Sequence, residues 1–261
     1  MEIWKKSFGD PDWYIEFMFK YRFKPEKTLT YLSDGKPVSM LMLLPAKLTN
    51  QEIFYVYGVA TLPEYRRQGF SSALISYANR SLPESTLGTF LCPATESLFS
   101  YYEKQKYESA FYMSEYNATL DELKDVKTSA FEFVDISPRA YKEIRDFSFK
   151  GDGYIEWDFD SVEYAVKENE LVGGKALLVT CGDEKGLVMY RKWDRKLYVK
   201  ETTLDGKLLK VTLKKIMEYE STPSCNVRLH PRSSLGGEPK KFAMIYGVSS
   251  NLNGYFNLAK D

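Results

Sequence analysis

Histidine and cysteine, the residues that commonly build metal sites and catalytic triads, are scarce in this sequence. Among 261 residues there is one histidine, His230, and there are three widely separated cysteines. A single imidazole argues against a histidine-based zinc site and a Ser-His-Asp triad, so we expect no metal. An odd and sparse set of cysteines argues against a disulfide framework and favours a reducing, cytoplasmic location.

An excess of charge and long apolar runs are lacking as well. The 36 Lys and Arg residues balance 36 Asp and Glu residues, so the formal net charge is zero. Nucleic-acid-binding proteins usually carry a basic excess, so no nucleic-acid partner is expected. The longest apolar run, Met40–Leu44, is far shorter than the about 20 residues that cross a bilayer. The N-terminal segment also lacks the apolar core of a signal peptide, so no membrane partner is expected.

What is present is an ordinary globular composition, with 44% apolar and 28% charged residues, which suits a bacterial cytoplasmic protein. The length fits one large domain or two ordinary ones. Residues 117–130 form a polar stretch that indicates a link between two halves. We therefore predict one domain over residues 1–122 and a second over residues 131–261.

The first half alternates helical and strand patterns. Asp10 and Pro11 predict the N-cap and first residue of a helix, and Asp34-Gly35 predicts the turn of a β-hairpin. Further strands are predicted at 53–60, 87–92 and 109–116. A helix between the first two of these is predicted to bury one face, made of Phe70, Ala73, Leu74, Tyr77 and Ala78. This order is typical of an α/β fold with a mixed sheet.

The second half repeats that order loosely. Helical patterns cover residues 138–147, 159–166 and 208–219. Strand patterns precede and separate them, and three more strands are predicted to close the chain, at 226–230, 242–248 and 255–259. We therefore predict a loose repeat of about 130 residues, consistent with two domains of similar size.

One strand-to-helix segment carries a pattern suited to phosphate. Gly69 stands where the helix is predicted to begin, and the first turn of a helix leaves backbone N–H groups without helical partners. Such a helix start binds phosphate readily, and the neighbouring Arg66 and Arg67 would add positive charge. Small Ser71 and Ser72 would keep the space open.

These residues resemble a known family. The run R-R-Q-G-F-S, Arg66–Ser71, resembles the acetyl-coenzyme A motif R/Q-x-x-G-x-G/A of the GNAT (GCN5-related N-acetyltransferase) superfamily. The preceding Val59–Tyr65 resembles the family's splayed strand and turn, and Leu91–Tyr107 resembles its later strand-helix segment. Two departures are Ser71, where the pattern has Gly or Ala, and Lys106, where it has Gly.

The resemblance implies acetyl-coenzyme A (acetyl-CoA) as cosubstrate. The backbone of Val59, Ala60 and Thr61 would hold the pantetheine arm, and the helix start would bind the pyrophosphate. The residues implied in the helix start are Arg66, Arg67, Gln68, Gly69, Phe70, Ser71 and Ser72. Tyr102 matches the family's frequent general acid, which protonates the departing thiolate, with the neighbouring Tyr101 as an alternative.

The second half lacks an Arg pair and a Gly at the corresponding helix start, which predicts a degenerate GNAT-like copy that contributes to the acceptor site. The chain then resembles tandem-GNAT acetyltransferases of the enhanced intracellular survival type, without their sterol-carrier-like third domain. In that type the C-terminal carboxylate serves as the base, which would be Asp261 here. Glu52 is an alternative base.

The expected activity is transfer of an acetyl group from acetyl-CoA to a primary amine of a small molecule or peptide, by direct attack in a ternary complex. Two alternatives stay open. One is aminoacyl transfer from tRNA on a related tandem fold, which the neutral charge disfavours. The other is a non-catalytic acyl-CoA sensor, in which Tyr102 is only a core residue. The acceptor and the oligomeric state stay open.

Overall fold

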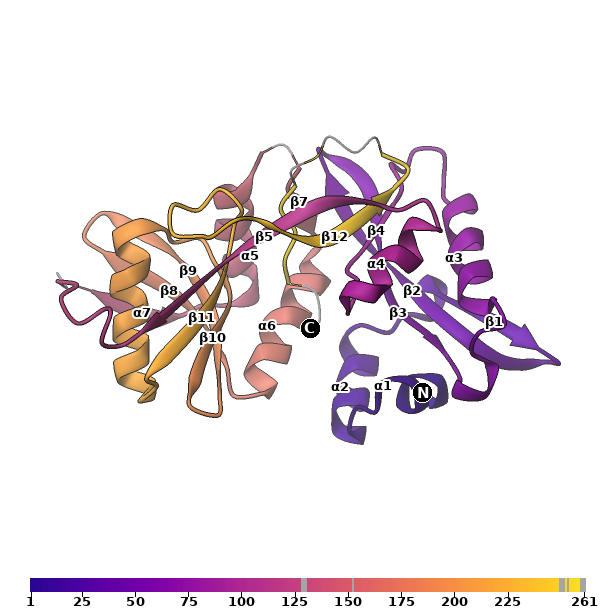
Figure 1. The fold of residues 1–261 in the computed structure, drawn as a ribbon, viewed down its shortest axis with the longest axis horizontal. Helices are drawn as coiled ribbons and strands as arrows, with labels where there is room; N and C mark the ends of the chain where they lie inside the picture. The colour runs from indigo at the N-terminus through magenta and orange to yellow at the C-terminus, as the bar shows by residue number, and fades with distance from the viewer. Residues whose placement is uncertain (128–130, 152, 249–251, 253, 259–261) are drawn as a thin grey trace. The chain divides into compact units, whose positions relative to one another are not determined.

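The computed structural model describes residues 1–127, 131–151, 153–248, 252 and 254–258, and it has a mixed α/β fold (Figure 1). The chain forms two compact units. Unit 1 contains Met1–Ala110, Glu156–Ser161 and Ala243–Leu252. Unit 2 contains Phe111–Ile155, Val162–Phe242 and the described residues 254–258. These units are not continuous in sequence, unlike the domains predicted over residues 1–122 and 131–261, which remain a prediction.

The sheet of unit 1 has the strand order β1-β2-β3-β4-β12. Neighbouring strands are antiparallel except β3 and β4, which are parallel. The turn between β1 and β2 has positive φ at both Asp34 and Gly35, as the hairpin prediction requires. The strand bounds are β1 Thr28–Ser33, β2 Lys36–Leu48, β3 Gln51–Thr61, β4 Thr89–Leu91 and β12 Lys240–Tyr246.

The helices that lie wholly in the described part of unit 1 are α1 Glu2–Phe8, α2 Asp12–Tyr21, α3 Phe70–Arg80 and α4 Glu96–Glu103. The sequence patterns did not indicate α1. The N-cap of α2 is Pro11, so the prediction of Asp10 as N-cap was wrong. The Asp10 carboxylate instead accepts a hydrogen bond from the Trp4 indole at 2.8 Å, which fixes α1 against the start of α2.

The core between α3, α4 and the sheet differs in part from the predicted helix face. Leu74, Ile75 and Ala78 of α3 are buried together with Phe99 and Tyr102 of α4. In contrast, Ala73 is exposed and Tyr77 is 55% exposed, so the prediction that they are buried was wrong. The buried face of α3 is therefore shifted around the helix axis from the predicted face, and it includes Ile75 instead of Ala73 and Tyr77.

The sheet of unit 2 has the strand order β5-β11-β10-β9-β8-β6, with β10 and β11 parallel. Its strands are β5 Glu108–Thr119, β6 Glu132–Asp135, β8 Lys175–Cys181, β9 Glu184–Trp193, β10 Lys196–Thr202 and β11 Ser224–Leu229. The helices are α5 Pro138–Phe149, α6 Phe159–Leu171 and α7 Gly206–Glu220. A short strand, β7 Ile155–Trp157, pairs with β2, and its last two residues belong to unit 1.

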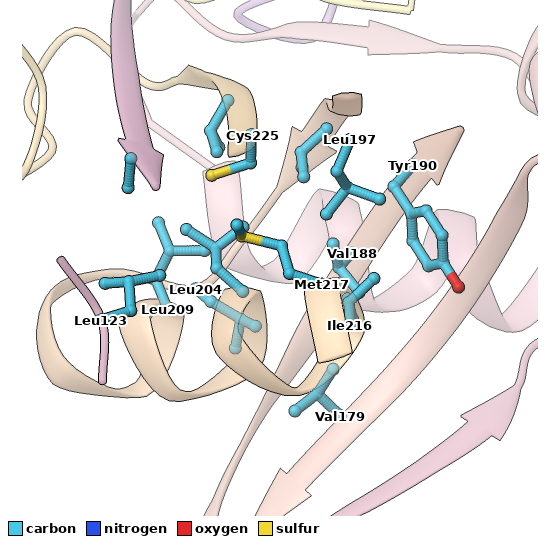
Figure 2. Close-up of a cluster of buried hydrophobic side chains, with 14 of the residues drawn as sticks. Leu123, Val179, Val188, Tyr190, Leu197, Leu204, Leu209, Ile216, Met217 and Cys225 are labelled. Carbon is cyan, nitrogen blue, oxygen red and sulfur yellow. The ribbon is translucent and has the colours of Figure 1, made fainter. Parts of the chain in front are cut away.

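The main core of unit 2 lies between α7 and the sheet. Figure 2 shows Leu209, Ile216 and Met217 of α7 pointing toward Val188 and Cys225 of the strands. The predicted helix over 208–219 is therefore confirmed. The predicted strand at 255–259 was wrong within the described residues, because Tyr255 forms only an isolated bridge with Tyr154.

The two units share one local arrangement. In unit 1 the strand β3 leads through α3 to its parallel neighbour β4, and in unit 2 the strand β10 leads through α7 to its parallel neighbour β11. This repetition is the structural counterpart of the loose repeat that the sequence predicts. No helix in the described part of the chain is long and apolar enough to cross a membrane.

Candidate functional site

The strand β3 contains a bulge near its end. Met40 and Met42 of β2 pair with Ala60 and Tyr57 of β3, so β3 has one extra residue between these pairs. Gly58 lies in this interval with φ +63°, a conformation that favours glycine. A Cβ atom on Gly58 would also lie 2.5 Å from the ring of Trp4. Both the backbone conformation and the contact with Trp4 therefore require glycine at position 58. The bulge changes the direction of the last residues of the strand.

Beyond the bulge, β3 continues without its parallel partner. The paired register with β4 covers Phe54 and Tyr55, whereas β3 extends to Thr61. The Ala60 carbonyl accepts a hydrogen bond from Ser39 Oγ at 2.8 Å, and the Thr61 carbonyl accepts one from Arg66 Nε at 3.2 Å. The strands β3 and β4 are therefore splayed at the end where the sequence placed the pantetheine arm, although two of the carbonyls there already have donors.

The helix α3 begins at an open, positively charged turn. Gly69 is its N-cap, with φ +84°, and a Cβ atom there would meet nothing within 4 Å. The first helical hydrogen bond runs from Ala73 N to Gly69 O at 2.9 Å, which leaves the N–H groups of the first turn available. Arg66 and Arg67 are both exposed beside this turn. The structure thus brings together the residues predicted to bind a pyrophosphate.

A hydroxyl cluster that sequence reasoning missed lies at the same helix start. The Tyr101 hydroxyl of α4 is 3.0 Å from Ser71 Oγ and 3.0 Å from Ser72 Oγ. Gln105 Nε2 donates a further hydrogen bond to Ser72 Oγ at 3.2 Å. The two serines were singled out only for their small size. No local pattern would have paired them with a tyrosine about thirty residues later, because that contact depends on how α4 packs against α3.

Tyr102 lies on the core face of α4. It is 8% exposed, and its ring contacts those of Tyr101 and Tyr107, with centroids 5.0 and 5.9 Å apart. Burial raises the pKa of the Tyr102 hydroxyl above its usual value, and the charges of Tyr101, Tyr107 and Cys92 act in the same direction. The phenol therefore keeps its proton throughout the neutral pH range.

Tyr107 supports this aromatic cluster from behind. Its hydroxyl is 2.6 Å from Thr89 Oγ1 and donates to Asn79 Oδ1 at 3.2 Å. Burial raises the pKa of Tyr107 to about 12, against the opposing effect of these hydrogen bonds. Hydrogen bonds to α3 and β4 thus fix the Tyr107 hydroxyl. Among the described residues, Tyr102 has ring contacts but no side-chain hydrogen bond.

The two candidate bases are not placed at this site by the structure. Asp261 lies outside the described residues. Glu52 is exposed at the start of β3, and at about 3.3 Å per residue it lies roughly 20 Å from the bulge. Among the described residues, no group of three or more His, Cys, Asp and Glu side chains could hold a metal ion.

The corresponding connection of unit 2 carries acidic groups instead. The strand β10 also has a bulge, because Val199 and Glu201 pair with the adjacent Tyr190 and Met189 of β9. Glu201 is fully buried and accepts a hydrogen bond from Arg145 Nε at 2.8 Å. The helix α7 follows after only residues 203–205 and has Asp205 as its N-cap.

The carboxylate of Asp205 is held by the segment after β11. It accepts hydrogen bonds from Ser233 Oγ at 2.6 Å and from Ser234 N at 2.9 Å. Burial alone would raise the pKa of Asp205, but the hydrogen bonds from Ser233, Ser234 and Gly206 outweigh it and lower the pKa. A negative charge therefore already stands at the start of α7.

The geometry of unit 1 agrees with a family match. Residues 1–110 match the model described as "Acetyltransferase (GNAT) domain". The match includes the bulged strand β3, the turn before α3 and the helix α4. The resemblance to the GNAT family is thereby confirmed over residues 1–110. No match was found among curated protein sequences.

Solved structures extend the fold similarity to both units. A GCN5-related N-acetyltransferase from Anabaena variabilis is similar with a TM-score of 0.75 at 17% identity, covering 94% of this chain and 68% of that one. One from Kribbella flavida has a TM-score of 0.66 at 18% identity, with 94% and 67% covered. Eis1 from Mycobacterium abscessus has a TM-score of 0.63 at 14% identity, with 94% and 69% covered. The chain has the GNAT fold.

Proposed function

We propose that this protein is an acetyl-CoA-dependent N-acetyltransferase whose acceptor is a primary amine. The observation that carries the proposal is the combination in unit 1 of a splayed, bulged strand and an open helix start. The strand β3 separates from β4 after Tyr55, and the turn before α3 presents Arg66, Arg67 and the N–H groups that follow Gly69. This combination suits an extended thiol arm that ends in a pyrophosphate.

Binding would use the backbone first and side chains second. Val59, Ala60 and Thr61 would line the pantetheine arm. Gln68, Gly69, Phe70, Ser71 and Ser72 would offer their N–H groups to the pyrophosphate. Because the Tyr101 hydroxyl already contacts both serine hydroxyls, it would hold their side chains in fixed rotamers beside the anion. Fixed donors lose less entropy on binding than mobile ones.

The chemical step would be a direct transfer. The neutral amine attacks the thioester carbonyl, a C–N bond forms, the C–S bond breaks, and the sulfur leaves with its electron pair. The Tyr102 hydroxyl would give its proton to that sulfur, although burial raises its pKa and so makes it a weaker acid than a free phenol. A base removes the proton from the new ammonium group. Asp261 is our candidate for that base, in preference to Glu52, because Glu52 lies far along β3 from the bulge.

The role of unit 2 is proposed on electrostatic grounds. Residues 131–261 would form a degenerate GNAT-like domain that binds no CoA, because Asp205 places a carboxylate at the start of α7. A phosphate brought to that point would meet a like charge. The sparse and odd set of cysteines in the sequence supports a cytoplasmic location.

Thermal unfolding with CoA tests the binding proposal. A ligand at about 100 times its dissociation constant stabilises by roughly 2.7 kcal/mol, a shift of a few degrees at this size. We expect CoA to raise the melting temperature of the wild type and to do so much less for an Arg66→Gln, Arg67→Gln double variant. Arg80→Gln, at the other end of α3, is the matched control and should respond like the wild type.

Tyr102→Phe separates catalysis from binding. We expect this variant to keep its response to CoA and to lose about 100-fold in turnover of an amine acceptor. The alternative function, a non-catalytic acyl-CoA sensor, has one observation in its favour, which is the burial of Tyr102 in the core. Equal turnover in Tyr102→Phe and the wild type would remove Tyr102 from the mechanism, and binding of CoA without turnover of any amine would favour the sensor.

A further inference from the structure

Unit 2 contains a cavity that the proposed acetyl transfer does not use. It has a volume of about 290 Å³ and lies at the carboxyl ends of β10 and β11, bordered by residues 148–151 and 202–205. All of its lining residues belong to unit 2. In open sheets, ligands bind outside the carboxyl ends of parallel strands. A volume near 300 Å³ suits a ligand of metabolite size.

One wall of the cavity is aromatic. Phe149, His230 and Tyr255 are among its lining residues. The Phe149 and His230 rings are nearly parallel, with an interplanar angle of 15°, and the Tyr255 ring lies 4.7 Å from His230 and 4.6 Å from Phe149 between centroids. Such a continuous surface of rings favours a planar ligand over a branched one.

A polar network, most of it buried, fixes two of the lining tyrosines. The Tyr255 hydroxyl donates to Glu201 Oε1 at 3.2 Å, and the Tyr154 hydroxyl donates to Asp146 Oδ1 at 2.6 Å. Arg145 connects them, because it binds Glu201 and also donates to the Tyr154 hydroxyl. Buried ion pairs contribute little to stability. Their usual benefit is a fixed arrangement, and here the side chains that they fix face a cavity.

The charges around the cavity favour an anion. Lys150 and Arg232 line it, and neither forms an ion pair within the part of the chain that the structure describes. Among the lining residues that the structure describes, the one carboxylate, Asp205, is already bound by Ser233 and Ser234. His230 Nδ1 accepts a hydrogen bond from Arg232 N at 3.1 Å, so a neutral imidazole carries its proton on Nε2. Burial and then Arg232 lower the pKa of His230, which keeps it neutral at pH 7.

We propose that this cavity is a binding site for a small aromatic monoanion, such as an aryl carboxylate. The ring lies against Phe149, His230 and Tyr255, and the carboxylate faces Lys150 and Arg232. None of its described lining residues is among those proposed to bind CoA or to transfer the acetyl group, so the assignment does not rest on acetyl transfer.

The single histidine provides a direct test. In the full chain labelled with ¹³C-histidine and carrying no histidine tag, the ring of His230 gives one Cε1–H signal, and this ring lines the cavity. We would titrate benzoate, benzamide, benzylammonium and acetate at constant pH. We expect benzoate to shift the signal saturably, with an affinity at least about tenfold higher than that of each other probe.

Three variants locate the binding. Arg232→Gln and Lys150→Gln should each weaken benzoate about threefold to tenfold. The matched control is Arg195→Gln, which removes an exposed charge before the opposite end of β10 and should leave the affinity unchanged. Since all three side chains are exposed, the variants should fold.

Three results would overturn the assignment. A His230 signal that benzoate does not shift saturably excludes the site. Equal affinities for benzoate, benzamide and acetate exclude recognition of an aromatic anion. Equal benzoate affinities in Arg232→Gln and Arg195→Gln exclude the proposed position of the carboxylate. Because CoA binding by unit 1 is measured separately, failure here leaves the proposed acetyltransferase function intact.

Discussion

Units 1 and 2 share a central strand, a helix and a parallel strand, but they differ at the start of that helix. Both central strands have a one-residue bulge near their carboxyl ends. Unit 1 then has an open turn with Arg66, Arg67 and the N-cap Gly69. Unit 2 has the buried Glu201 and the N-cap Asp205. The same backbone arrangement can therefore accept an external anion or supply an internal one, depending on a few side chains.

The largest effect is expected from the buried acid of unit 2. Removal of one partner from a buried ion pair costs about 3–5 kcal/mol. We expect Glu201→Gln to lower the free energy of unfolding by this amount, since Arg145 would keep its charge with no full partner. Glu163→Gln, in a partly exposed helical pair with Lys167, should cost below about 0.5 kcal/mol. Urea denaturation of both variants measures the difference, and equal costs would contradict it.

The bulge of unit 1 should depend on glycine more strongly than a simple turn does. Gly58→Ala combines a left-handed backbone with a Cβ atom placed 2.5 Å from Trp4, and we expect a loss of about 2–4 kcal/mol. Gly182 has nearly the same φ, +62° against +63°, with nothing within 4 Å. Gly182→Ala should cost about 1 kcal/mol. Denaturation midpoints of the two variants give the comparison, and similar losses would show that the contact with Trp4 is unimportant.

A charge swap should convert the first helix start into the second. Gly69→Asp places a carboxylate at the N-cap of α3, as Asp205 does for α7, in open space but at a φ of +84° that favours glycine. We expect CoA affinity to fall about 100-fold. Gly69→Asn has the same shape without the charge and should lose at most a few-fold. Calorimetric titration with CoA measures both affinities. Equal affinities of the two variants would contradict the proposal that charge at the helix start distinguishes the two units.

The smallest effect concerns Asp205 and depends on pH. Loss of the charged acceptor for Ser233 and Ser234 costs about 1 kcal/mol. Because the pKa of Asp205 is lowered in the folded protein, its contribution is present above the unfolded pKa and is lost as the pH falls through the folded pKa. We expect wild type and Asp205→Asn to differ in stability at pH 5–8 and to converge below about pH 4. If the two proteins still differed in stability at low pH, the effect of the substitution would not come from the charge of Asp205.

Turns and helix ends were the features of the fold that the sequence predicted best, because they depend on a few neighbouring residues. The hairpin at Asp34-Gly35 and the helix start at Gly69 follow from backbone preferences of single residues, and the structure has both. Contacts between distant segments could not be read in this way. Asp10 is bound by Trp4 instead of capping α2, and the Tyr101 hydroxyl meets two serines of another helix.

The bulge of β3 did have a signal in the sequence, although no bulge was predicted there. Gly58 is an isolated glycine within a strand pattern, which is a known signal for a bulge or a close backbone approach. The charge network of unit 2 had no comparable signal. Arg145 and Glu201 are 56 residues apart, and nothing in either local pattern marks them as a buried pair.

The return of the chain to unit 1 has a consequence for synthesis on the ribosome. The strand β4 is fully buried and lies between β3 and β12, and its partner residues Met244–Tyr246 are translated long after the rest of unit 1. Until they emerge, the nascent chain exposes the edge of an apolar strand, the kind of surface that attracts other chains. Ribosome-associated chaperones would therefore have a defined interval in which to act, between completion of β4 and release of β12.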